Sequence, residues 1–206
     1  MNIKPKVALP LIAVAFSVAF CATVASPARE RVRQAAVAGA FYPKDAVELA
    51  GMVDGFLARA GEAAPKGQIV ALIAPHAGYP FSGEVAAHSY ALLKGRPAHR
   101  VVVIAPSHFE AFGFASVYDG DAYITPLGRI PVDKDFARKL ARTTGEVQLS
   151  SRGHAPSAQG GEHSLEVQLP FLQRMLGSFQ LVPIIMGESP AGRGGCPAHA
   201  PPPPRG

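Results

Sequence analysis

The chain has 206 residues, of which 48% are apolar, 17% charged and 8% aromatic, and it contains no Trp. This length is sufficient for one globular domain with a substantial core and leaves little room for a second. The low charge argues against a solvated tail protein or a long coiled coil. Two Cys are too few for a small disulfide scaffold or a multi-Cys zinc module, and the net charge of +5 includes no basic block that would indicate nucleic-acid binding.

Residues 1–28 have the pattern of an export signal. Two early lysines form a positive n-region, Val7–Phe20 is an apolar run, and small residues then offer cleavage near Ala25 or Ala28. The run is shorter than the roughly 20 apolar residues that a membrane-spanning helix needs. We therefore expect a secreted or periplasmic protein without a stable membrane span. The alternative is a protein anchored to the membrane by an uncleaved N-terminus.

The first folded element expected after this signal is a helix. Asp45 with Glu48 three residues later is a helix-start signature, and apolar residues from Leu49 to Leu57 recur at helical spacing until Gly61. The pattern predicts an amphipathic helix between Asp45 and Gly61.

Two continuous apolar runs of strand length follow, Gln68–Ala74 and Arg100–Ala105. Such runs are typical of strands that are buried on both faces. Between them, Ser82 can cap a helix that runs to about Leu93. A strand, a helix and a strand within about 40 residues predict a right-handed βαβ unit with parallel strands.

The α/β alternation continues to residue 187. Further elements are expected as strands at 114–118, 129–132 and 179–186, a short helix after Asp133, and a helix from Leu165 to Leu176 that Pro170 kinks near Glu166. Residues 29–187 are therefore expected to form one α/β domain, with a mainly parallel central sheet flanked by helices.

Residues 188–206 differ in composition from everything before them. They are rich in Gly and Pro, with four consecutive prolines at 201–204, and show no hydrophobic periodicity. Such a segment buries too little apolar surface to offset its ordering entropy, so a disordered tail is expected. Cys196 and His199 lie three residues apart, and chance explains this spacing better than half of a metal site. The abrupt change after Gly187 predicts that the end of the domain is missing, through truncation or a shifted reading frame.

The two predicted parallel strands end in the same way, one in Pro75-His76 and the other in Pro106-Ser107-His108. The carboxyl ends of parallel strands meet at one edge of a sheet, where open α/β sheets bind ligands. We therefore expect His76 and His108 to converge and to hold a divalent metal ion, with a third ligand and an open position for water or substrate. The alternative is that each is an ordinary loop histidine bonded to the backbone.

A second candidate site is Gly160–Glu166, which is expected to begin a helix. Glycines and free N–H groups at a helix start can receive an anion. Glu162 and Glu166 lie one helical turn apart with His163 between them. This grouping can supply a general base, a proton donor or a metal ligand. In the alternative interpretation, Glu162 and Ser164 only cap the helix and Glu166 is solvated.

The remaining histidines and motifs indicate less. His154 lies in a predicted loop without an evident partner, and His88 lies within a helix, where a structural role is expected. The sequence contains no G-x-S-x-G elbow, phosphate-binding Gly-Lys-Ser/Thr loop or dinucleotide glycine fingerprint. Acyl-transfer, nucleotide and NAD chemistry therefore lack their usual motifs.

Several segments, taken together, resemble the Memo family, called AmmeMemoRadiSam system protein B in bacteria. They occur in the family's order over residues 37–187 and are Val37–Pro43, Ala74–Tyr79 with Ser82-Gly83 and Ala86–Tyr90, Ala105–His108, Thr125–Gly128 and Glu162–Leu172. No single segment is specific, but the joint match is.

The resemblance implies an α/β fold similar to that of the class III extradiol dioxygenases, with a metal-type cleft at the strand ends. It implies that His76 and His108 are the first two metal ligands and that Glu162 and His163 line the same cleft. The family continues with a Ser-Ser-Asp-x-x-His-like motif and then a Cys-Gly motif that supplies the third ligand. The sequence contains neither, and Cys196 is followed by Pro. A C-terminally incomplete domain without a third protein ligand is therefore expected to bind metal weakly.

Three functional hypotheses follow. In the first, a Memo-like protein holds iron or copper through His76 and His108 and performs oxidoreductase chemistry on a small molecule or dioxygen, while His163, with Glu162, handles protons. In the second, a non-catalytic protein of the same fold binds a ligand or peptide. In the third, the chain is an inactive truncated product.

Overall fold

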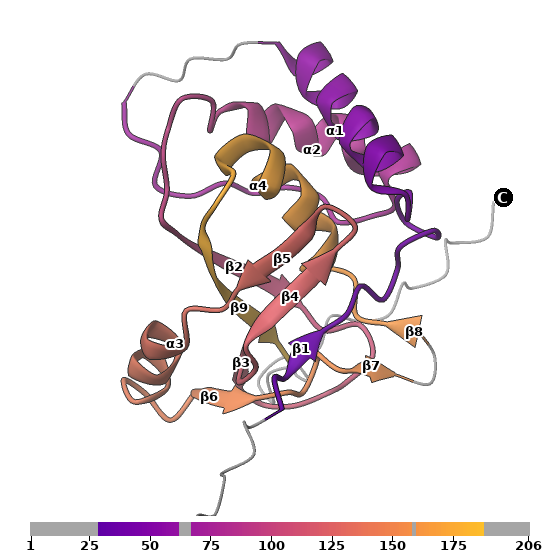
Figure 1. Ribbon diagram of the computed structural model, residues 1–206. Coiled ribbons are helices and arrows are strands. Elements are labelled where there is room, and N and C mark those ends of the chain that lie inside the picture. Colours follow the sequence, from indigo (N-terminus) through magenta and orange to yellow (C-terminus); the bar gives the residue numbers. More distant parts are fainter. Residues whose placement is uncertain (1–28, 62–66, 158–159, 188–206) are drawn as a thin grey trace, which may run out of the picture.

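The computed structural model describes residues 29–61, 67–157 and 160–187 (Figure 1). The predicted export signal at 1–28 and the predicted tail at 188–206 lie outside these ranges. The helices are α1 (Ala46–Ala60), α2 (Tyr79–Ala91), α3 (Lys134–Ala141) and α4 (Leu169–Leu176), with a 3₁₀ turn at Glu166–Gln168. The strands are β1 (Val32–Arg33), β2 (Arg100–Pro106), β3 (Ala115–Tyr118), β4 (Ala122–Thr125), β5 (Gly128–Pro131), β6 (Val147–Ser150), β7 (Pro156–Ser157), β8 (Gly160–Gly161) and β9 (Gln180–Met186).

The central sheet has the strand order β2-β9-β3-β6. β2 and β9 run parallel from Arg100↔Gln180 to Pro106↔Met186, β3 and β6 are also parallel, and an antiparallel pairing of β9 with β3 joins the two halves. Two smaller sheets have the orders β1-β4-β5 and β7-β8. The expected α/β class with a mainly parallel central sheet is confirmed, and the single antiparallel joint makes that sheet mixed.

Helices cover the two faces of the central sheet unequally. Leu181 and Ile185 of β9 belong to the main core cluster, which also includes residues of α1, α2 and α4. Val182 and Ile184 point to the opposite face and form a smaller cluster with Ala137 of α3. Figure 1 shows α1, α2 and α4 gathered on one side of the strands and α3 on its own beside β6.

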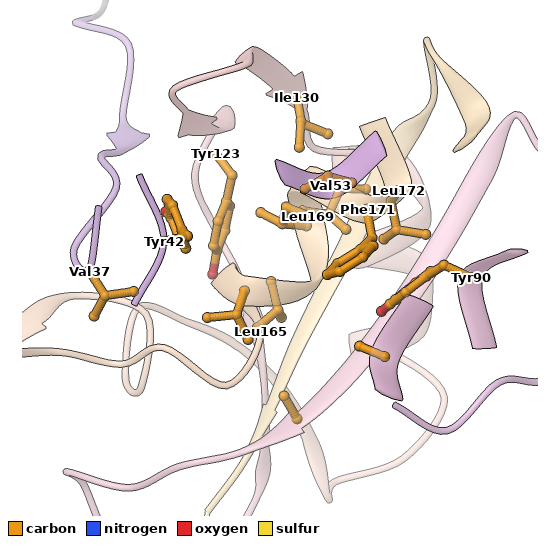
Figure 2. Close-up of a cluster of buried hydrophobic side chains, with 14 of the residues drawn as sticks. Val37, Tyr42, Val53, Tyr90, Tyr123, Ile130, Leu165, Leu169, Phe171 and Leu172 are labelled. Carbon is orange, nitrogen blue, oxygen red and sulfur yellow. The ribbon is translucent and has the colours of Figure 1, made fainter. Parts of the chain in front are cut away.

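Helix α4 forms the centre of the main core. Leu169, Phe171 and Leu172 are each buried, and Figure 2 shows them between Tyr90 of α2 and Tyr123 of β4. The rings of Phe171 and Tyr90 stack with their centroids 5.1 Å apart. This packing anchors the segment directly before α4, which carries part of the candidate site.

Local capping explains where two helices begin. The Asp45 side chain accepts hydrogen bonds from the backbone N–H groups of Val47 and Glu48, both at 2.9 Å, and α1 ends at Gly61. Asp133 accepts a bond from Phe136 N at 2.9 Å and caps α3. Both predicted helix starts are confirmed.

The predicted strand Gln68–Ala74 is wrong. This segment has no regular secondary structure, and Val70 and Ile73 are 94% and 93% exposed. An apolar run becomes a buried strand only where a neighbouring strand and covering layers are present, and the parallel partner of β2 is β9, from much later in the chain. The predicted βαβ unit of adjacent strands is therefore not formed by these two runs.

Two predicted helix boundaries also need correction. α2 begins at Tyr79 rather than Ser82, because Pro80 fits the first turn, where its missing N–H leaves no hydrogen bond unmade. Pro170 likewise lies in the first turn of α4 and begins that helix instead of kinking it. The residues before it form the 3₁₀ turn at Glu166–Gln168.

No helix within the described part of the chain is both long enough and apolar enough to span a membrane.

Candidate functional site

His108 lies directly beyond the carboxyl end of β2. Pro106 is the last residue of that strand and donates no ladder hydrogen bond, so the chain leaves the sheet there. The Pro106 carbonyl instead accepts a 2.7 Å bond from Ser164 Oγ. This bond connects the end of β2 to the segment that carries Glu162 and His163.

His76 lies just before α2, at the end of the irregular segment that replaces the predicted strand. The Pro75 carbonyl accepts a bond from Gln168 Nε2 at 3.2 Å, and Tyr79 N donates to the Phe41 carbonyl at 2.7 Å. These bonds on both sides of His76 fix its backbone, although no strand precedes it.

Glu162 and His163 follow β8 and do not begin a helix, which corrects the expectation for Gly160–Glu166. The segment is held by close packing, because a Cβ at Gly161 would lie 1.9 Å from Ala36 Cβ. Only glycine allows this approach. The Glu162 carboxylate then turns back to accept bonds from its own neighbours, His163 N and Ser164 N, both at 2.9 Å.

Glu162 also holds His108 from two directions. Its Oε2 accepts from His108 N at 2.5 Å, and its Oε1 lies 2.9 Å from His108 Nδ1. Burial alone would raise the pKa of the Glu162 carboxyl, but the hydrogen bonds from His108 and Ser164 outweigh it and lower the pKa to about 2. A carboxylate that stays ionised accepts a proton-bearing Nδ1, so the lone pair of His108 is on Nε2.

Three imidazole rings come together at this place. The ring centroids of His108 and His163 are 4.5 Å apart, those of His76 and His108 are 5.2 Å apart, and those of His76 and His163 are 6.2 Å apart. The planes of His108 and His163 are nearly parallel, at 18°, whereas those of His76 and His108 cross at 60°. The structure thus brings together all four residues singled out from the sequence.

This cluster contains a group that could hold a metal ion. One ligand atom from each of His108, Glu162 and His163 lies within 4.8 Å of the other two. His76 lies outside this group but beside it, with its ring next to that of His108. Nitrogen and oxygen donors of this kind suit divalent transition metals.

The environment keeps two of the imidazoles neutral at neutral pH. Burial lowers the pKa of His76 and of His163, and the neighbouring His108 lowers both further, while Glu162 acts in the opposite direction. The apolar ring of Phe41 lies 4.5 Å from that of His163. Neutral imidazole is the form that binds metals and accepts protons.

Glu166 is buried, so the interpretation of a solvated Glu166 is wrong. Its carboxylate pairs with the buried Arg33 guanidinium and accepts bonds from Tyr42 Oη and from the Val37 N–H at 3.0 Å. Arg33 also donates to the Glu162 carbonyl. This ion pair lies directly behind the site and fixes the backbone of Glu162.

His154 is fully buried and has two partners, contrary to the sequence-based expectation. Its Nε2 lies 2.9 Å from the Ser116 carbonyl, which can only accept, so Nε2 carries the proton and Nδ1 accepts from Tyr123 Oη. Burial lowers the pKa of His154 to about 4. Its partners are 38 and 31 residues away in the sequence, and no local pattern signals them.

Comparison with known proteins decides the family. Residues 33–199 of the chain match the Memo family, which is described as "Memo-like protein". The chain belongs to the Memo-like family. The resemblance found in the sequence is therefore confirmed.

Three curated relatives of this Memo-like chain, all from archaea, illustrate the similarity. It is 39% identical over 166 residues to a MEMO1 family protein of Methanopyrus kandleri, an alignment that covers 75% of this chain and 56% of the relative. It is 34% identical over 158 residues to one of Thermoplasma volcanium (76% and 56% covered), and 38% identical over 161 residues to one of Thermococcus kodakarensis (76% and 53% covered). The chain spans about half the length of the curated relatives it matches.

Proposed function

We propose that this Memo-like protein binds one redox-active metal ion, iron or copper, through His76 and His108 and performs oxidoreductase chemistry on a small molecule. The observation that carries the proposal is the cluster of three imidazoles, one of which is oriented by a buried carboxylate. Carboxylate–histidine pairs of this kind orient metal ligands in proteins and fix the tautomer that binds.

Glu162 acts in this proposal by positioning His108 and not as a ligand. Its two oxygens already accept four hydrogen bonds, from His108 N and Nδ1, His163 N and Ser164 N. Little acceptor capacity remains for an ion. The same bonds occupy His108 Nδ1, so Nε2 is the nitrogen left to bind an ion.

Ring orientation selects His76 as the second ligand. The lone pair of an imidazole nitrogen lies in the ring plane, so two rings can share an ion only where their planes meet. The planes of His76 and His108 cross at 60°, whereas His163 stacks almost parallel on His108. With metal–nitrogen distances of about 2.1 Å, two imidazoles on one ion have centroids about 4.5–5.2 Å apart, which fits the 5.2 Å between His76 and His108.

His163 is left to move protons. It lies against His108 and is neutral because burial lowers its pKa. A neutral imidazole beside a metal site can accept a proton from a bound small molecule and return it later. When bound, iron or copper supplies the electron transfer that no side chain of this site provides.

Metal analysis of the purified full chain tests the ligand assignment. We expect iron or copper at up to one ion per chain, lost in H76A and H108A and retained in H163A. The matched control is H88A, because His88 is an exposed histidine on α2, away from the cluster.

Each other result contradicts part of the proposal. Loss of metal in H163A with retention in H76A would assign the ion to the His108–Glu162–His163 group instead. A wild-type chain that unfolds cooperatively but takes up neither metal favours the alternative of a non-catalytic protein that binds a ligand or peptide. A chain without a cooperative transition favours the inactive product.

A further inference from the structure

Arg33 and Glu166 form a buried ion pair behind the three imidazoles. Arg33 is 5% exposed and Glu166 is 1% exposed. Taking two charges out of water is costly, and apolar residues of similar volume often stabilise a fold equally well. What such a pair supplies is directional hydrogen bonding, because a guanidinium is a rigid fork of donors. The role of this pair therefore follows from the groups that it holds.

The Arg33 guanidinium connects distant parts of the backbone. Besides pairing with Glu166, it donates from Nη2 to the Glu162 carbonyl. It also donates from Nε to the His154 carbonyl at 3.0 Å. The backbone position of Glu162, and with it the side chain that holds His108, therefore depends on a donor 129 residues earlier in the chain.

The Glu166 carboxylate fixes the N-terminal segment 33–42. It accepts hydrogen bonds from Ala36 N at 2.9 Å, from Val37 N at 3.0 Å and from Tyr42 Oη. Three donors of one segment meet at this group because an ionised carboxylate only accepts. The N-terminal segment is therefore attached to the ion pair along much of its length.

This N-terminal segment also contacts two of the parts that carry imidazoles. The centroid of the Phe41 ring lies 4.5 Å from that of His163. The Phe41 carbonyl accepts from Tyr79 N at 2.7 Å, and a Cβ at Gly78 would lie 3.5 Å from the same oxygen. The segment thus touches the ring of His163 and the backbone just after His76.

From these contacts we propose that the Arg33–Glu166 ion pair positions the three imidazoles. It holds Glu162 directly, and it holds the ring of His163 and the backbone beside His76 through the N-terminal segment. Both members of the pair act through other residues and are therefore positioning residues. The proposal rests on the proposed function only for its effect on metal binding, because the arrangement of the rings is measurable in the metal-free chain.

The first variant is R33K. Lysine keeps a positive charge beside Glu166, but its donors share one atom and do not reproduce the guanidinium fork. NMR of the metal-free full chain measures NOEs between the rings of Phe41 and His163 and between those of His163 and His108. We expect both NOEs in the wild type and the loss of both in R33K. We also expect the affinity for iron or copper to be about tenfold or more weaker in R33K.

The matched control is R100K, because Arg100 pairs with Asp133 at the opposite end of β2 from His108. We expect R100K to keep both NOEs and the wild-type metal affinity. The second variant is R33M/E166Q, in which neutral side chains of similar size replace both charges, so that no buried charge is left alone. We expect this variant to unfold cooperatively and to lose the same NOEs.

The ring contacts decide the outcome. Retention of both NOEs in R33K or in R33M/E166Q overturns the proposal. So does an equal loss of NOEs in R100K, because the loss then follows from weakening any arginine ion pair. If the NOEs are lost as expected but the wild type takes up no metal, the positioning role is supported and the proposed metal chemistry is contradicted. The two proposals can therefore fail separately.

Discussion

Glu162 is buried and accepts four hydrogen bonds, two of them from His108. In the E162Q variant, one oxygen becomes an NH₂ group, which meets N–H donors instead of accepting from them. His108 is then free to rotate. We expect metal affinity to fall about 10- to 100-fold, as is typical when a group that orients a ligand is lost, measured by competition with a chromogenic chelator.

The control for this substitution is E84Q, because Glu84 forms an exposed ion pair with Arg59. Its metal affinity is expected to match that of the wild type. Complete loss of metal in E162Q, equal to that in H108A, would instead identify Glu162 as a ligand. Unchanged affinity would show that His108 needs no orienting group.

The lowered pKa of buried His154 leads us to expect that the stability of the fold depends on pH. Its pKa is about 4 in the folded chain and about 6.5 in an unfolded one, so the unfolded state binds more protons between these values. Stability is therefore complete above pH 6.5 and falls as the pH is lowered from 6.5 to 4, by at most about 3 kcal/mol from this residue.

We expect the H154Q variant to be less stable at neutral pH, because it loses the fit to Tyr123 and Ser116, and to show a shallower loss of stability between pH 6.5 and 4. Urea unfolding at a series of pH values measures both effects. His99 lies exposed in a loop, so in H99Q the free energy of unfolding should depend on pH as it does in the wild type. If the free energy of unfolding fell equally between pH 6.5 and 4 in H154Q and in the wild type, the buried, neutral state of His154 would be contradicted.

At the scale of elements, Gly161 of β8 controls how closely the site segment approaches the N-terminal part of the chain. In G161A the new Cβ would lie 1.9 Å from Ala36 Cβ, and Ala36 is itself held by a 2.9 Å bond from its N–H to Glu166 Oε2. The strand must therefore move and carry Glu162 with it. We expect the free energy of unfolding to fall by about 1–3 kcal/mol and metal affinity to fall as well.

The control for G161A is G145A, because a Cβ at Gly145 meets nothing within 4 Å. Chemical denaturation and metal titration of both variants check the expectation. If G161A is as stable as G145A, the contact with Ala36 is not what positions β8.

Elements that depend on local chemistry could be predicted from the sequence. The side chains of Asp45 and Asp133 cap helices through bonds to residues two or three positions away, so the pattern contains the whole interaction. β9 was also predicted within one residue at its start, because a continuous apolar run fits a strand that is buried on both faces.

Features that depend on distant partners could not be predicted in this way. Gln68–Ala74 has the same apolar pattern as β9 but lacks a neighbouring strand, and periodicity does not reveal neighbours. The burial of Glu166 depends on Arg33, 133 residues away. His76 and His108 lie close together as expected, although the predicted reason, two adjacent parallel strands, does not apply to the first of them.

At the scale of the whole molecule, the candidate site connects three separate parts of the chain. His76 precedes α2, His108 follows β2, and Glu162 and His163 lie between β8 and α4. An ion bound to His76 and His108, as proposed, would link the helical layer to the end of the central sheet. Because the unfolded chain does not hold these residues together, we expect metal binding to stabilise the folded state.

This linkage predicts a metal-dependent melting temperature. At a free metal concentration 100 times the dissociation constant, binding adds about 2.7 kcal/mol, which raises Tm by about 5–10 °C for a domain of this size. Thermal unfolding of the apo chain with iron or copper measures the shift, and a chelator should reverse it. H108A should show no shift, whereas H88A should shift like the wild type. A shift of equal size in H108A would mean that the stabilising ion binds away from the three imidazoles, because removing the central ring leaves His76 without a partner for a shared ion.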